Sequence, residues 1–167
     1  MKMDDGWKSL QQVNEWIRFA DAKAVAILAA SGLLGGLVVK AIPHYRSLAA
    51  HPVHTVLLGL AMVCIGASAI TTLRTITPRL RAGEARSLLY FEHIAKRYSA
   101  DRAGFVENFL NLLDDDARLA RQVGDQLWAN SLVARGKFRR VAYATWFLSG
   151  GMIFAGTAVL ADRLWNW

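Results

Sequence analysis

The chain has 167 residues, of which 54% are hydrophobic and 20% are charged, with 20 lysines and arginines against 13 acidic residues. The charges are segregated, because three stretches, Ala24–Ile42, Val53–Leu73 and Val141–Ala161, contain a single charged residue, Lys40. This segregation excludes a soluble globule, whose core helices alternate polar and apolar faces, and a disordered chain, which is poor in apolar residues. The composition therefore predicts an integral membrane protein with a basic soluble part.

Residues 1–23 predict an amphipathic cytoplasmic helix that leads into the first apolar stretch. Its apolar residues recur at helical spacing. They are Trp7, Leu10, Val13, Trp16 and Ile17. Such a helix can lie on the inner membrane surface or pack on a soluble domain, and the pattern leaves both possibilities open.

Residues 24–73 predict a transmembrane hairpin, and residues 141–167 predict a third transmembrane helix with the C-terminus. About 20 helical residues, each rising about 1.5 Å, cross a hydrocarbon core of roughly 30 Å, and each apolar stretch has this length. The connection from Pro43 to Pro52 is short, so the first two spans are expected to be antiparallel.

The lysines and arginines predict how the spans are oriented. With a cytoplasmic N-terminus, all but three of the 20 basic residues lie on the cytoplasmic side, and only Lys40, Arg46 and Arg163 lie outside. Cytoplasmic loops carry the excess of positive charge in membrane proteins. We therefore expect a cytoplasmic N-terminus and a C-terminus on the opposite side.

Residues 74–140 predict a small helical cytoplasmic insert between the second and third spans. Thr77-Pro78 is a suitable start for a helix to about Ser99, and Asp101 can cap a shorter helix after it. The run Asp114–Asp116 suits the positive end of a last helix. No proline follows, so the last helix is expected to continue into the third span. The predicted fold class is all-α.

The sequence contains no catalytic motif, so we do not expect an enzyme. The one Gly-Lys pair, Gly136-Lys137, lacks the upstream glycine of a phosphate-binding loop. Three histidines, His44, His51 and His54, lie near one another, but no cysteine or acidic residue joins them, and no metal site is expected. No cofactor is expected either.

Two stripes of basic and aromatic residues on the insert are the candidate ligand-binding surface. Guanidinium groups bind phosphate, and aromatic rings stack on bases. At about 100° per residue, each stripe falls on one side of its expected helix. The candidate ligand-binding residues are Arg79, Arg86, Tyr90, His93 and Arg97 on the first helix and Arg121, Trp128 and Arg135 on the last. The alternative is a solvated face near anionic headgroups. The modest positive charge of the insert does not favour nucleic acid as a partner.

Polar residues on the inward face of the last helix, namely Gln126, Asn130 and Lys137, predict a hydrogen-bonded network or the rim of a ligand pocket. We expect Lys137 to pair with Asp21, because both lie where a helix meets the inner membrane face. The alternative is that Lys137 extends to the interface by itself. The residues expected to couple the cytoplasmic helices to the spans are Asp21, Lys23, Asn130 and Lys137.

Three segments of the chain resemble the Pycsar transmembrane effectors. They are Trp16–Ala24 before the first span, Leu88–Ala95 after the second, and Ser131–Val133 with Lys137-Phe138 and Ala144 entering the third. Their order and placement relative to the spans cover essentially the whole chain. Glu92 stands where the family is expected to have a glycine.

The resemblance implies a role in bacterial defence against phage. In such systems a partner cyclase makes cyclic CMP or cyclic UMP on infection, and the effector senses it and impairs the inner membrane, so that the infected cell dies or stops growing. The chain would then be a multi-pass protein of the bacterial inner membrane with a periplasmic C-terminus. Because the insert is small and three spans make a poor pore, we also expect a homo-oligomer. The alternative is a constitutive membrane scaffold whose basic insert recruits an acidic protein partner.

Overall fold

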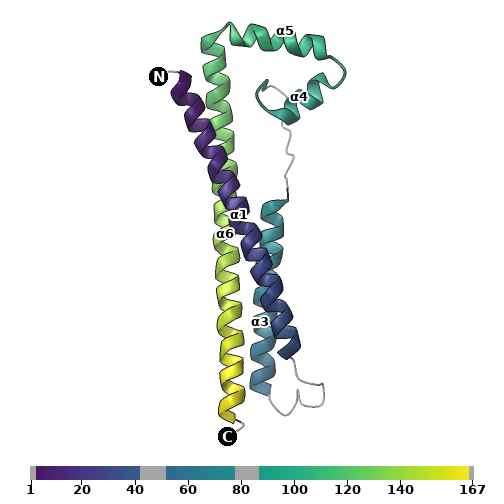
Figure 1. The fold of residues 1–167 in the computed structure, drawn as a ribbon, viewed down its shortest axis with the longest axis vertical. Helices are drawn as coiled ribbons and strands as arrows, with labels where there is room; N and C mark the ends of the chain where they lie inside the picture. The colour runs from purple at the N-terminus through teal and green to yellow at the C-terminus, as the bar shows by residue number, and fades with distance from the viewer. Residues whose placement is uncertain (1–2, 42–51, 78–86, 166–167) are drawn as a thin grey trace. The chain divides into compact units, whose positions relative to one another are not determined.

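The computed structural model describes residues 3–41, 52–77 and 87–165 (Figure 1). Within these ranges the chain is helical throughout, apart from short connections, and contains no strand. The helices are α1 (Met3–Ala41), α3 (Pro52–Ile76), α4 (Phe91–Tyr98), α5 (Arg102–Leu113) and α6 (Asp116–Trp165). The predicted all-α fold class is confirmed.

Three of these helices are long and apolar enough to cross a membrane. The candidate spans lie within Asp4–Ala41, Pro52–Ile76 and Asp116–Arg163. Helix α1 has 39 residues and continues unbroken from its amphipathic beginning into the first span, because no proline interrupts it. Helix α6 has 50 residues for the same reason. The predicted continuity of the last cytoplasmic helix with the third span is therefore confirmed.

The described chain divides into two compact units. The unit called the soluble unit below contains described residues of 1–19 and 78–136, and the unit called the membrane unit contains described residues of 20–77 and 137–167. Helices α1 and α6 contribute residues to both units. In α3 the buried positions alternate at spacings of three and four residues, as in a coiled-coil seam. These positions are Leu58, Ala61, Ile65, Ser68, Thr72 and Thr75.

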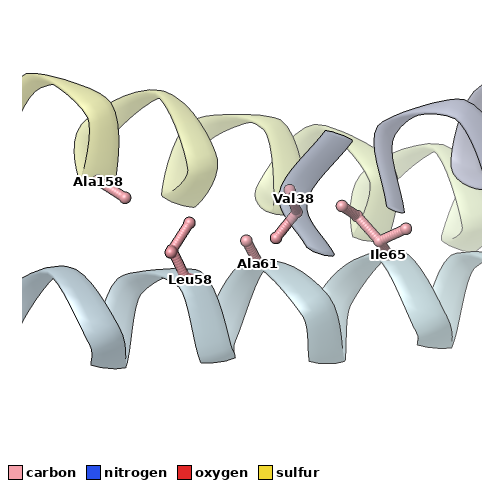
Figure 2. Close-up of a cluster of buried hydrophobic side chains, with 5 residues drawn as sticks. All are labelled: Val38, Leu58, Ala61, Ile65 and Ala158. Atoms are coloured by element: carbon pink, nitrogen blue, oxygen red, sulfur yellow. The ribbon is translucent and has the colours of Figure 1, made fainter. Parts of the chain in front are cut away.

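The core of the membrane unit is formed by side chains from three helices. Figure 2 shows Val38 from α1, three residues from α3 and Ala158 from α6. The α3 residues are Leu58, Ala61 and Ile65. Small residues at such positions allow the helices to approach closely, which supports packing where lipid supplies no hydrophobic driving force.

One buried serine joins all three helices of the membrane unit. The Ser31 hydroxyl on α1 donates to Ser68 Oγ on α3 at 3.1 Å, and the Ser68 hydroxyl donates to the Ala144 carbonyl on α6 at 2.8 Å. Ser31 and Ser68 are only 2% and 0% exposed. A buried hydroxyl in an apolar environment needs such partners, so this contact fixes the relative register of the helices.

The soluble unit has a separate core in which aromatic rings pack in sequence along α4 and α5. Tyr98 meets Phe105 edge-on with ring centroids 5.5 Å apart, and Phe105 stacks on Phe109 at 5.7 Å. The buried residues of this core are Leu88, Leu112, Leu119 and Val123. Asp101 caps α5 by accepting a hydrogen bond from the Gly104 amide at 2.8 Å, which confirms its predicted role.

The predicted helix from Thr77-Pro78 to Ser99 is wrong for residues 87–90. Of the part that the structure describes, only Phe91–Tyr98 is α-helical, and Tyr90 has an extended backbone with φ −110° and ψ 120°. The amides of Ser87, Leu88 and Leu89 bond to side chains and not to preceding carbonyls, so this segment cannot continue a helix. Pro78 and the residues up to Arg86 lie outside the described ranges.

The amphipathic face predicted for the start of α1 is only partly buried. Leu10 and Val13 are 7% and 6% exposed, whereas Trp7 and Trp16 are 39% and 49% exposed. The buried seam continues along α1 through Ala20 and Ala24, and the large indole rings lie beside it. The small residues of the seam permit closer helix packing than an indole would.

Gly151 is a glycine of α6 at which a larger side chain is expected to be harmful, because α3 packs closely against it. A Cβ at this position would lie 2.7 Å from Ile65 Cγ1 and 3.3 Å from the Ala61 carbonyl oxygen on α3. We expect Gly151→Ala to cost about 1–3 kcal/mol and to lower the melting temperature of the detergent-purified protein. Gly156→Ala is the matched control, since a Cβ there meets no atom within 4 Å, and its melting temperature should stay equal or rise. Equal melting temperatures for both variants would contradict the close packing of α3 on α6.

Candidate functional site

A hollow in the soluble unit brings together residues from the segment before α4, from α4 and from α6. Its volume is about 460 Å³. The lining residues are Ser87, His93, Gln122, Asp125, Gln126, Trp128 and Ala129. Two of them, His93 and Trp128, were predicted as ligand-binding residues from the sequence.

Three hydrogen bonds position the wall of the hollow before α4. The Ser87 amide donates to His93 Nδ1 at 3.2 Å, and the Leu89 amide donates to Ser87 Oγ at 3.2 Å. The Leu88 amide donates to Gln122 Oε1 on α6 at 3.0 Å, while the Leu88 side chain is 4% exposed in the core. His93 Nδ1 acts as an acceptor, so its ring proton lies on Nε2.

Two aromatic side chains, Tyr90 and Trp128, accompany His93 at this hollow. The ring of Tyr90 meets His93 edge-on, with centroids 4.9 Å apart and planes at 85°. Trp128 lines the hollow from α6 and is 68% exposed, although most large aromatic side chains of a soluble domain are covered. The structure therefore gathers Tyr90, His93 and Trp128 from the predicted set.

The arginines of the predicted set do not line this hollow, as far as the structure describes them. Arg97 is exposed on α4 and lies over the ring of Tyr98, with its guanidinium carbon 5.2 Å from the ring centroid. Arg121 and Arg135 are exposed on α6. Arg79 and Arg86 lie outside the described residues. Because Tyr90 precedes α4, the expected single helical stripe does not exist on the described residues.

Four lining residues were not identified as site candidates from the sequence, namely Ser87, Gln122, Asp125 and Ala129. Gln122 and Asp125 are spaced three residues apart on α6 beside the buried Val123, and this polar pair next to a core position was the available signal. Ser87 gave no signal, because its role depends on a turn that brings its amide to His93.

A polar chain connects the hollow to α1 within the soluble unit. Gln126 Nε2 donates to Asn130 Oδ1 at 3.1 Å, and Asn130 Nδ2 donates to Asn14 Oδ1 on α1 at 2.8 Å. The predicted hydrogen-bonded network on the inward face of α6 is confirmed for these two α6 residues. Asn14 was not predicted.

The predicted ion pair between Asp21 and Lys137 is present in the membrane unit. Lys137 Nζ donates to Asp21 Oδ1, and the side chains of Lys137 and Asp21 are 17% and 37% exposed. The pair joins α1 to α6. Lys23 is exposed on α1, and the role of all four residues in coupling stays a prediction.

No group of three or more histidine, cysteine or acidic residues that could hold a metal lies among the described residues. His54 is half-buried near the start of α3, and His44 and His51 lie outside the described ranges.

The pair of Asp21 and Lys137 can be tested by exchanging its charges. Asp21→Lys or Lys137→Asp alone places like charges together, and each should lower the melting temperature of the purified protein. The double exchange should recover part of the loss, with a coupling energy on the order of 1 kcal/mol, because both side chains retain some solvent. A double variant no more stable than either single variant would contradict the pair.

The contact between Gln122 and Leu88 can be tested by hydrogen–deuterium exchange of the full-length protein. Gln122→Leu removes the acceptor of the Leu88 amide, and exchange in the segment 87–90 should accelerate roughly five- to tenfold. Gln12→Leu, at an exposed position of α1, is the control and should leave this segment unchanged. Unchanged exchange in Gln122→Leu would show that another contact holds the wall.

Comparison with known proteins identifies the family of the chain. A family model for the Pycsar effector protein domain matches residues 5–161. Pycsar effector protein MePycTM of Micromonospora echinofusca is 49% identical over 59 residues, which cover 35% of this chain and all of that relative. Pycsar effector protein PtPycTM of Propioniciclava tarda is 27% identical over 142 residues, covering 80% of this chain and 67% of that relative. No solved structure matches the chain significantly. The chain therefore belongs to the Pycsar effector family, as a membrane effector of anti-phage cyclic-nucleotide signalling.

Proposed function

We propose that a cyclic pyrimidine mononucleotide, cyclic CMP or cyclic UMP, made by a partner cyclase switches this effector on, and that the active state impairs the bacterial inner membrane. The observation that carries the proposal is the single helix α6. It supplies Gln122, Asp125 and Trp128 to the hollow and continues without a break into the third candidate span. The family match over residues 5–161 supports the same function.

The proposed signal acts through the packing of α6 against α1. A ligand shifts an equilibrium between two packings only by its differential affinity for them. Polar contacts such as Asn14–Asn130 and Asp21–Lys137 can be exchanged between alternative registers, whereas tightly fitted apolar side chains resist small displacements. The residues proposed to couple ligand binding to the spans are Asp21, Lys23, Asn130 and Lys137.

The proposed output is loss of membrane integrity by an oligomer of this chain. Three spans enclose too little space for a conducting pore, so several copies are needed. We propose the orientation that the basic residues favour, with the N-terminus in the cytoplasm, where a cyclase product is made, and the C-terminus in the periplasm.

This function predicts that membrane damage depends on the cyclase product. Cells that express the chain together with an active pyrimidine cyclase should lose membrane potential within minutes of cyclase induction, as measured with a potential-sensitive dye. An inactive cyclase and an adenylate cyclase are the controls and should leave the potential intact. Equal potentials with active and inactive pyrimidine cyclase would contradict the proposal and favour a constitutive scaffold that recruits an acidic protein partner.

A further inference from the structure

We infer that the hollow is the site of the nucleotide base, and that Asp125 reads the base by accepting a hydrogen bond from an N–H group on its edge. This inference rests on the proposed function and adds to it the place of the base and the direction in which the base faces. It also moves the base site from the arginine stripes to a wall formed by α6 and the segment before α4.

The hydrogen bonds already present decide which groups remain for a ligand. Gln122 uses its oxygen for the Leu88 amide, so its Nε2 hydrogens remain as donors. His93 uses Nδ1 for the Ser87 amide, so its Nε2–H remains as a donor. Gln126 gives Nε2 to Asn130, so its Oε1 remains as an acceptor. The hollow therefore offers both donors and acceptors on one wall.

Asp125 is the one charged side chain among the described residues that line the hollow. A carboxylate is an acceptor only and repels a phosphate, so the phosphate of a bound cyclic nucleotide faces away from it. A base edge suits it better. Cytosine carries an N4 amino group and uracil carries N3–H, and each of these donors is flanked by an acceptor atom of the base. The donors of Gln122 and His93 are available to those flanking acceptors.

Trp128 supplies the second independent indication of a base. Its ring is 68% exposed on the wall of the hollow, in the soluble unit and outside the buried core. An exposed indole beside hydrogen-bonding groups is the arrangement that proteins use to stack a nucleobase. A purely solvated surface does not need an aromatic ring at this position.

The site also has a direct path to α1 in the soluble unit. Gln126 lines the hollow and bonds to Asn130, which bonds to Asn14. A base that donates a hydrogen bond to Gln126 Oε1 therefore contacts the first side chain of the polar chain between α6 and α1. Occupancy of the hollow is thus linked to the helix packing on which the proposed switch depends.

The test is a binding titration of the full-length protein in detergent with cyclic CMP, cyclic UMP and cyclic AMP. The wild type should bind at least one of the two pyrimidine nucleotides. Asp125→Ala should weaken that binding about tenfold or more, because it removes a charged hydrogen-bond acceptor. Glu107→Gln, at an exposed acidic residue of α5 outside the hollow, is the control and should bind as the wild type does. Trp128→Ala should also weaken binding, and Trp128→Phe should restore part of it.

A modified ligand separates base recognition from an indirect effect of the substitution. Methylation of the donor nitrogen, as N4,N4-dimethylcytosine or N3-methyluracil, removes the N–H and should weaken binding to the wild type by a similar factor. It should cause little further loss in Asp125→Ala, since the partner is already absent.

The outcomes distinguish the inference from the function on which it rests. If the folded wild type binds neither pyrimidine nucleotide, the proposed function and the inference both fail. If it binds one of them but Asp125→Ala and the methylated ligand bind equally well, only the base site in the hollow is overturned. The methylated ligand tests the base site on the wild type even if Asp125→Ala does not fold.

Discussion

Backbone amides and carbonyls that enter a bilayer must be hydrogen-bonded within their own helix, and this constraint sets the architecture of the chain. It favours uninterrupted helices, and the sequence from Asp116 to Trp165 contains no proline to break one. The same helix therefore supplies Leu119 and Val123 to the soluble core and Ala158 to the membrane core. A rotation or shift of α6 within one unit also moves the part of α6 in the other unit, unless the helix bends or breaks.

Helices α1 and α6 also make polar contacts, in addition to the apolar packing of the two cores. A paired charge or amide in a partly buried seam adds less stability than apolar packing, but it defines which residues face one another. Asn14 with Asn130 and Asp21 with Lys137 define such registers in the soluble and the membrane unit respectively. A ligand can shift an equilibrium between two helix packings only by the difference in its affinity for them. Contacts between α1 and α6 that define a register but add little stability are therefore suited to a change of packing that a ligand has to drive.

The sequence predicted those features that depend on local composition. The spans follow from hydropathy, the unbroken α6 from the absence of proline, and the pair of Asp21 and Lys137 from opposite charges at the same depth of two helices. The hollow could not be predicted, because its wall depends on a bond from the Leu88 amide to Gln122, 34 residues away. The helical spacing of the sequence also wrongly placed residues 87–90 in the helix before Phe91. Spacing alone does not show that side chains accept hydrogen bonds from the backbone amides of this segment.

A cyclic nucleotide has to be distinguished from the many other phosphate compounds of a cell, and the arginine stripes and the hollow differ in how well they can do this. Arginines bind any phosphate, so arginine contacts add affinity without selecting one nucleotide. The exposed Arg121 and Arg135 also suit anionic lipid headgroups. Selection among nucleotides has to come from groups that contact the base, which differs between them. An amide donor, a carboxylate and an indole on one wall are therefore a better basis for a specific signal than a larger number of positive charges.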